Sequence, residues 1–376
     1  MKSYIKKIES RVMEIFDHLH GNAEISWKEF KTTNYIAQFL EAEGVRVTTF
    51  KDHTGVIGEF GEGKPVVAIR ADMDALWQEV DGVFQANHSC GHDAHMSIVL
   101  GVLLVIKEYL PNPKGTIRFI FQPAEEKGTG ALKMVEKGVV DDVDYLYGMH
   151  LRPIQELPNG TAVPAIVHGA ARFFQGSIMS DDTHGARPHL GKNAIEIGAS
   201  IVTMLNNIHL DPMQPHSVKM TSFHAGGESS NIIPGSATFS LDLRAQKNET
   251  MEQLAKKVND IITFLADYYD VEIKMEMGAD VAAAEVNKQA EKLMEQSISE
   301  VLGKKHLRPP LITTGGDDFH FYTIKRPRLK ATMLGIGCDL APGLHHPKMT
   351  FKKEAITQAI EILTRTIILT LEGREA

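Results

Sequence analysis

The chain has 376 residues, of which 43% are hydrophobic and 23% are charged, and its formal net charge is -8. This composition is typical of a soluble globular protein. The acidic balance, without any run of Lys or Arg, argues against nucleic acid or an anionic membrane as the main partner. No segment reaches the roughly 20 apolar residues that a transmembrane helix needs. Cys90 and Cys338 are the only cysteines, too few for a disulfide framework, so we expect reduced thiols and a cytoplasmic location.

Helix and strand patterns alternate over the first 165 residues. Their spacing predicts helices at about 2–20 and 27–43, a short buried strand at 66–70, a helix at 94–110 with Asp93 as N-cap, and strands at 115–122 and 143–149. Such alternation is typical of an α/β fold in which helices flank a mainly parallel sheet.

From residue 171 the order of elements changes to β-α-β-β-α-β, the order of a ferredoxin-like α+β unit. The expected elements are strand 172–179, helix 192–207, strands 217–224 and 236–244, helix 250–269 and strand 271–277. The α/β pattern resumes after 283 with helix 286–302, strand 329–336 and helix 353–371. We therefore predict a catalytic domain formed by 1–170 and 284–376, with an inserted domain at 171–283.

Acidic, imidazole and thiol groups gather where predicted strands end or a helix begins. Asp72 and Asp74 follow the strand at 66–70, a Glu-Glu pair follows the strand at 115–122, and a Cys-Gly-His motif opens the helix at 94–110. Ligand sites of α/β folds lie at the carboxyl ends of strands, and these residue types bind divalent metals. One glutamate of the pair could bind metal while the other serves as general base.

Each cluster also has an ordinary explanation when it is taken alone. Adjacent glutamates are common on solvated surfaces, aspartates are frequent in turns, and a free cysteine is more often a small buried hydrophobe than a ligand. A cysteine nucleophile activated by histidine is a further functional alternative.

Seven motifs, in order, resemble those of the M20 metallopeptidase and amidohydrolase family, in the branch of aminoacylases, hippurate hydrolases and auxin-conjugate hydrolases. They are ADMDAL at 71–76, HSCGHDAH at 88–95, FQPAEE at 121–126, GMH at 148–150, THGARPH at 183–189, SSNIIPG at 229–235 and LHHP at 344–347. The resemblance implies a dinuclear metal site in the α/β domain and makes the inserted domain a lid and dimerisation domain.

The resemblance also implies individual roles. Glu125 matches the general base, and Asp74 matches the aspartate that supports the metal site. In the lid, His184 and Asn231 resemble residues that stabilise the tetrahedral intermediate, and this histidine often serves the partner subunit's site. Arg244 resembles the arginine that grips the substrate carboxylate, a bidentate task suited to guanidinium. The implied metal ligands are Cys90, His92, Glu126, His150 and His345, with His346 as the alternative to His345.

The implied activity is cleavage of N-acyl amino acids by a metal-activated water, with two ions per chain drawn from Mn, Zn, Co or Ni. An M20-type dipeptidase or exopeptidase and a catalytically silent binding homologue are the alternatives, and a homodimer through the lid is expected. Three departures from the family pattern bear on specificity: Trp77 replaces a proline, Ser89 an alanine and Asp317 a glutamate.

Overall fold

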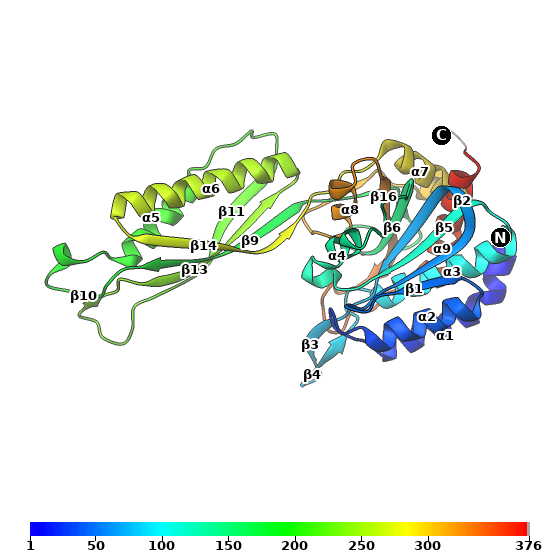
Figure 1. The fold of residues 1–376 in the computed structure, drawn as a ribbon, viewed down its shortest axis with the longest axis horizontal. Coiled ribbons are helices and arrows are strands. Elements are labelled where there is room, and N and C mark those ends of the chain that lie inside the picture. Colours follow the sequence, from blue (N-terminus) through cyan, green and yellow to red (C-terminus); the bar gives the residue numbers. More distant parts are fainter. Residues whose placement is uncertain (374–376) are drawn as a thin grey trace. The chain divides into compact units, whose positions relative to one another are not determined.

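The structure is a computed structural model that describes residues 1–373 (Figure 1). It divides into two compact units. The first comprises Met1–Val167, Glu285–Ile312 and the described residues from Asp318 onward; the second comprises His168–Ala284 and Thr313–Asp317. The short segment Thr313–Asp317 groups with the second unit because the backbone N–H of Gly169 donates to the carbonyls of Thr313 (3.0 Å) and Gly315 (3.2 Å). The sequence pattern does not separate this segment from its surroundings.

A six-stranded, mainly parallel sheet forms the centre of the first unit, which confirms the predicted mixed α/β architecture. Parallel pairs join β2 to β5, β2 to β6 and β6 to β16, while β1 and β7 are antiparallel to β2 and β16. The strands are β1 (Arg46–Thr49), β2 (Val56–Asp72), β5 (Lys114–Gln122), β6 (Tyr145–Pro153), β7 (Ala162–Val163) and β16 (Lys330–Leu340).

Strand β2 is much longer than the predicted strand at 66–70. Both halves of β2 pair with β5. The partner residues on β5 run in opposite directions for the two halves, and the change lies between Glu62 and Val66. The second half carries the apolar run that the sequence shows, and successive side chains there point to opposite faces. Ile69 belongs to the main hydrophobic core, whereas the equally buried Arg70 bonds to Asp318.

Helices cover the sheet of the first unit. Helix α3 contacts both α1 and α9, while α4 contacts α8, and Figure 1 shows these two groups on different sides of the sheet. All residues from His92 to Ile106 of α3 are buried, as expected for a helix that is apolar on every side. The helices are α1 (Lys2–Gly21), α2 (Phe30–Ala42), α3 (His92–Tyr109), α4 (Gly130–Glu136), α7 (Lys288–Leu302), α8 (His320–Lys325) and α9 (Glu354–Leu371), with 3₁₀ turns η1 (Glu125–Lys127) and η3 (Lys304–His306).

Two small two-stranded sheets lie outside the central sheet. Strands β3 (Leu76–Val80) and β4 (Val83–Asn87) form an antiparallel hairpin, and β8 (Ile166–His168) pairs with β15 (Leu311–Thr313). Within the described residues, no helix combines the length and the apolar character that crossing a bilayer requires.

The second unit contains a four-stranded antiparallel sheet with the strand order β11-β13-β9-β14. Alternate residues of β13, such as Phe239, Leu241 and Leu243, are buried in a core shared with α5 and α6, whereas Arg244 is partly exposed. The elements are β9 (Ala170–Met179), β10 (Thr183–His184), η2 (Pro188–Leu190), α5 (Ala194–Asn206), β11 (His216–Ala225), β12 (Ile232–Ile233), β13 (Ala237–Ala245), α6 (Asn248–Tyr269) and β14 (Glu272–Val281). Its role as a lid or dimerisation domain stays a prediction.

Candidate metal centre

Cys90 and His92 flank Gly91 at the start of α3. Gly91 has φ of 88° and is the N-cap of the helix, so the expected cap at Asp93 is wrong. A left-handed residue lets the chain turn sharply between the two side chains, and glycine adopts it without a Cβ penalty. Asp93 instead lies in the first helical turn, where its carboxylate accepts from the Ala94 N–H (2.8 Å).

His150 approaches the same point from the sheet. Its Nε2 lies 3.5 Å from Cys90 Sγ, and its Nδ1–H donates to the carbonyl of Leu151 (2.7 Å). The expected strand end at residue 149 is wrong, because β6 continues to Pro153 and includes His150. The hydrogen bond at Nδ1 orients the ring so that Nε2 is free to bind a metal.

Glu125 and Glu126 begin the 3₁₀ turn that follows β5. The preceding Ala124 has φ of 52°, which turns the chain out of the strand. Glu125 Oε2 and Glu126 Oε1 each lie 4.0 Å from Nε2 of His92. Both adjacent carboxylates therefore lie near the ring of His92 at the start of α3.

His345 completes the group from the C-terminal part of the chain. Its Nε2 lies 3.3 Å from Glu126 Oε1, and its backbone N–H donates to the Ser89 carbonyl (2.8 Å). The side chain of Gln78 donates to the His345 carbonyl (2.7 Å). His346, by contrast, accepts at Nδ1 from the Lys348 N–H (3.1 Å). The geometry therefore favours His345 over His346 as the ligand.

These side chains fit a pair of divalent ions. Donor atoms within 4.8 Å of one another form overlapping groups, one of Cys90, His92 and His150 and another of Cys90, Glu126 and His345. Ligands held tetrahedrally at about 2.0–2.3 Å from an ion lie roughly 3.3–3.8 Å apart, close to the contacts described above. Among the described residues, the buried His92 Nε2 has no hydrogen-bond partner, and the buried Glu126 Oε1 has only the 3.3 Å contact with His345 described above. A buried polar atom without a partner is costly, and a cation between these side chains would satisfy His92 Nε2 and neutralise the charge of Glu126.

Asp74 is hydrogen-bonded to both segments that carry these side chains. Its carboxylate accepts from the backbone N–H groups of Glu125 and Glu126 (3.1 Å each) and from Ser26 Oγ (2.6 Å). His92 Nδ1–H donates to the Asp74 backbone carbonyl (2.8 Å) and lies 3.3 Å from its Oδ1. One buried aspartate thus fixes both the ring of His92 and the turn that carries the two glutamates.

Sequence reasoning missed a second buried hydrogen-bond network, which adjoins the candidate metal centre. Asp72 accepts from Arg70 (2.6 Å) and from His95 Nδ1 (2.7 Å), while His95 Nε2 accepts from the Leu151 N–H (3.1 Å). His95 Nε2 thus holds the backbone next to His150, while Nδ1 anchors the ring to Asp72. The available sequence signal was an arginine inside an apolar strand, since a buried charge requires partners.

Burial and neighbouring charges shift the pKa values of three side chains in the group. Burial raises the pKa of the Cys90 thiol well above its usual range, and the carboxylate of Glu126 adds to this effect. Burial lowers the pKa of His150, with a further contribution from His95. For His92, burial is outweighed by the charges of Asp72 and Cys90, and its pKa is raised. A nucleophilic cysteine needs a depressed pKa, so these shifts weigh against the cysteine-nucleophile alternative.

His184, Asn231 and Arg244, which the sequence assigns to one inserted domain, lie in two separate places within the second unit. His184 lies opposite Ile232 in the β10–β12 pair, and the Gly185 N–H donates to the Asn231 carbonyl (2.7 Å), so His184 and Asn231 are neighbours. Arg244 lies near the other end of β13, seven residues beyond Ala237, or about 24 Å at the usual rise of an extended strand. Within this unit, Arg244 is not close to the His184–Asn231 pair.

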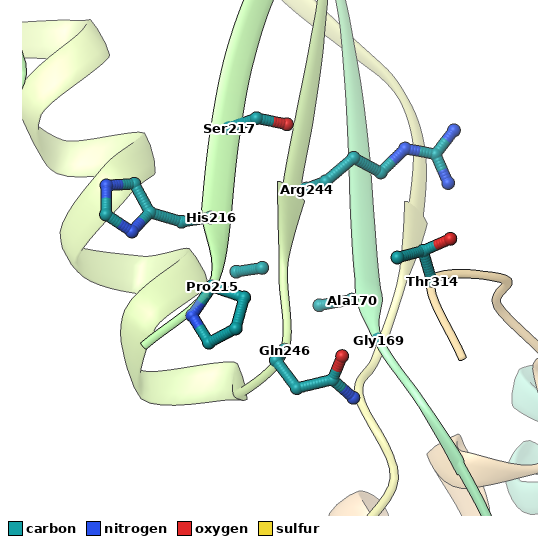
Figure 2. Close-up of a pocket in the computed structure, with 9 residues that line it drawn as sticks. Gly169, Ala170, Pro215, His216, Ser217, Arg244, Gln246 and Thr314 are labelled. Atoms are coloured by element: carbon teal, nitrogen blue, oxygen red, sulfur yellow. The ribbon is translucent and has the colours of Figure 1, made fainter. Parts of the chain in front are cut away.

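A pocket of about 190 Å³ adjoins Arg244 and is lined also by His216, Ser217 and Thr314 (Figure 2). Figure 2 shows the arginine side chain extending from β13 across the neighbouring strand β9. Its guanidinium lies 5.0 Å from the ring centroid of Phe173, and its Nε donates to Asp242 (2.8 Å). The arginine is held by this stacking and retains donors for an anionic group.

A model of peptidase family M20/M25/M40 matches residues 68–369. The chain belongs to this family. As an M20 protein it is a metal-dependent hydrolase that acts on amide bonds.

Individual relatives of this M20 hydrolase are consistent with that assignment. It is 33% identical to an N-acyl-L-amino acid amidohydrolase of Geobacillus stearothermophilus, over 69% of this chain and 75% of the relative. It is 28% identical to an N-acetyl-L-cysteine deacetylase of Bacillus subtilis, over 99% of this chain and 91% of the relative. A crystal structure from Bacillus subtilis, described as a dinuclear metal binding peptidase from the M20 family, aligns with a TM-score of 0.82 at 27% identity, covering 98% of this chain and 100% of that one.

Proposed function

We propose that this M20 hydrolase cleaves the amide bond of N-acyl amino acids and releases a carboxylate and a free amine. The observation that carries the proposal is the convergence of Glu125 and Glu126 on the Cys90–His92 group, with Asp74 accepting from the backbone of both glutamates. The relatives that act on N-acyl amino acids support this substrate class.

Two divalent ions per chain, of Mn, Zn, Co or Ni, would be held by the gathered side chains. The ions, when bound, would polarise the substrate carbonyl and lower the pKa of a water molecule. The ligands we assign to them are Cys90, His92, Glu126, His150 and His345. A thiolate among imidazole and carboxylate ligands favours borderline ions such as Zn²⁺ without excluding the others.

Glu125 would act as the general base. Its backbone is held by Asp74 (3.1 Å), while its carboxylate reaches within 4.0 Å of His92 Nε2. It accepts a proton as the water oxygen bonds to the acyl carbon, and it returns that proton to the amine nitrogen as the C–N bond breaks. Cys90 has no part in bond formation in this scheme.

The second unit would supply substrate contacts. Arg244 would pair with the substrate carboxylate from its pocket, and His184 with Asn231 would stabilise the oxyanion. Because the His184–Asn231 pair and Arg244 lie near opposite ends of β13, we assign His184 to the active site of a second subunit. A loss of one oxyanion donor typically costs about 10²–10³ in rate.

A homodimer through the second unit would bring these residues together. Strand β11 is an edge strand of the four-stranded sheet, and edge strands pair readily with another chain. The adjacent helix α5 exposes Ile195 (50% exposed) and Val202 (38% exposed) two turns apart on one face. Size-exclusion chromatography with light scattering tests the dimer.

The proposed function is tested by amine release from a panel of N-acyl amino acids and dipeptides, with each metal added in turn. Glu125→Gln should retain bound metal and lose hydrolysis by orders of magnitude, whereas Glu126→Gln should also lose metal. The exposed Glu136 offers a matched control, since Glu136→Gln leaves the site untouched. Near-normal turnover by Glu125→Gln would refute the assignment, and turnover of dipeptides alone would replace the proposed substrate class.

A further inference from the structure

Three consecutive backbone N–H groups of the turn that carries the glutamates are held by two buried carboxylates. Asp74 accepts from Glu125 and Glu126, as described, but the N–H of Ala124 donates to a different acid, Glu29 (2.9 Å). Glu29 is separated from Ala124 by 95 residues in the chain. The turn is thus fixed at its first amide by a residue outside the family motifs that the sequence displays.

The side chain of Glu29 points away from the helix that it begins and bonds to Ala124 and Thr54. Glu29 is the N-cap of α2, yet its side chain makes no capping hydrogen bond to that helix. Its carboxylate is fully buried, and its second oxygen accepts from Thr54 Oγ1 (2.6 Å). Within the described residues it forms no ion pair, although a buried carboxylate without a cation is costly. Burial raises its pKa to about 7.

The amide that Glu29 holds belongs to a residue in a disfavoured conformation. Ala124 has φ of 52° and ψ of 42°, the left-handed region that residues with a Cβ rarely adopt. Such conformations persist only where surrounding contacts fix them, and they concentrate at functional sites. Ala124 is followed at once by Glu125 and Glu126, so its backbone angles set where both carboxylates point.

The segment that carries Glu29 also contacts the other supporting acid. Ser26 Oγ donates to Asp74 (2.6 Å), and the Ala75 N–H donates to the carbonyl of Glu24 (2.8 Å). The chain from Glu24 to Glu29 therefore holds the loop after β2 as well as the turn after β5. Glu29 therefore belongs to a connected hydrogen-bond network that holds both segments.

We propose that Glu29 is a positioning residue that holds Ala124 in its left-handed conformation and thereby directs Glu125 and Glu126 to the metal centre. The proposal rests on the roles given above to those two glutamates. It deepens the proposed function by adding a residue whose side-chain oxygen holds the turn that carries these glutamates.

Four variants of the full chain separate this role from a general loss of stability. Glu29→Gln keeps an oxygen that can accept from Ala124, while its amide group can donate to Thr54. Glu29→Asp keeps the charge but shortens the reach, and Glu29→Ala removes the acceptor. Thr54→Val is the matched control, because it removes only the second hydrogen bond of Glu29. Circular dichroism monitors folding of each.

The main measurement is Zn²⁺ affinity of metal-free protein, by competition with a chromogenic chelator, because it needs no substrate. Loss of a supporting partner typically weakens metal binding about 10–100-fold. We expect that loss for Glu29→Ala and Glu29→Asp, with Glu29→Gln and Thr54→Val within about threefold of the wild type. In turnover of whichever substrate the panel identifies, kcat should fall more than KM rises.

A double variant tests the role of the backbone directly. Glycine adopts the left-handed region freely. The double variant Glu29→Ala/Ala124→Gly should therefore bind Zn²⁺ at least threefold more tightly than Glu29→Ala alone. Wild-type affinity in a folded Glu29→Ala would overturn the proposal, as would wild-type affinity in Glu29→Asp with a loss in Glu29→Gln. If Glu29→Ala does not fold, the comparison of Glu29→Asp with Glu29→Gln decides the question. Failure of all substrates would refute the proposed function and leave this test intact.

Discussion

The substitution Asp74→Asn tests the support of the metal centre with almost no change in shape. The aspartate uses Oδ1 to accept from Glu125 N–H and Oδ2 to accept from Glu126 N–H and Ser26 Oγ. An asparagine has one oxygen and one NH₂ group, so in either orientation its NH₂ faces a backbone N–H. At least one hydrogen bond to a charged acceptor is lost, which costs about 1.5–3 kcal/mol.

That cost should appear mainly in metal binding. A loss of about 10–100-fold in affinity corresponds to about 1.4–2.8 kcal/mol, which agrees with the value expected from one lost hydrogen bond. Competition with a chromogenic chelator measures the affinity of metal-free Asp74→Asn for Zn²⁺. The control is Asp260→Asn on helix α6, which changes only an exposed pair with Lys256. Affinity within twofold of the wild type, in a folded Asp74→Asn protein, would refute this account of the turn.

Further predictions concern pH, thiol reactivity and the C-terminal ligand. The pKa of Glu29 is about 7 in the folded protein and 4.5 as its ordinary value, so the unfolded chain binds fewer protons between these pH values, and the stability contribution of Glu29 falls as pH rises. Urea unfolding at pH 5 and pH 8 should show the wild type losing about 2.5 kcal/mol relative to Glu29→Gln, and equal pH dependence of the two proteins would contradict it. Iodoacetamide at neutral pH should label Cys90 and Cys338 of the metal-free folded protein slowly, because burial raises both thiol pKa values, that of Cys338 to about 12; rapid labelling of Cys90 would restore the nucleophile alternative. His345→Ala should weaken metal binding and His346→Ala should not, and the reverse order would exchange their roles.

The regular elements could be predicted from the sequence because their periodicity is local. The apolar run of α3 and the alternation along β13 both follow from neighbouring residues, and the observed bounds lie close to the expected ones. The length of β2 could not be predicted, since it depends on pairing of both its halves with β5. The end of β6 was misplaced for a similar reason, because β16 supplies partners for its residues up to Pro153.

The candidate site shows the same division between local and distant information. The motifs pointed to the residues that the structure gathers around His92, and the choice between His345 and His346 needed the hydrogen bonds around them. The network beneath the ligands joins Arg70 to Asp318 across 248 residues, and such a pairing leaves little trace in a single sequence. The separation of His184 from Arg244 follows from the direction of β13, which the motifs do not contain.

The position of β16 within its sheet has a consequence for the synthesis of the chain. This strand lies between β6 and β7 although it is the last strand of the unit to leave the ribosome. The sheet of the second unit is complete in sequence by Val281 and can form while later residues are still being made. A nascent or truncated chain that stops before Lys330 exposes the edge of β6, which invites pairing with other chains. Because His345 follows β16, the ligand set proposed above is complete only after β16 has been synthesised, so metal loading by that set comes after the central strand of the sheet has been made.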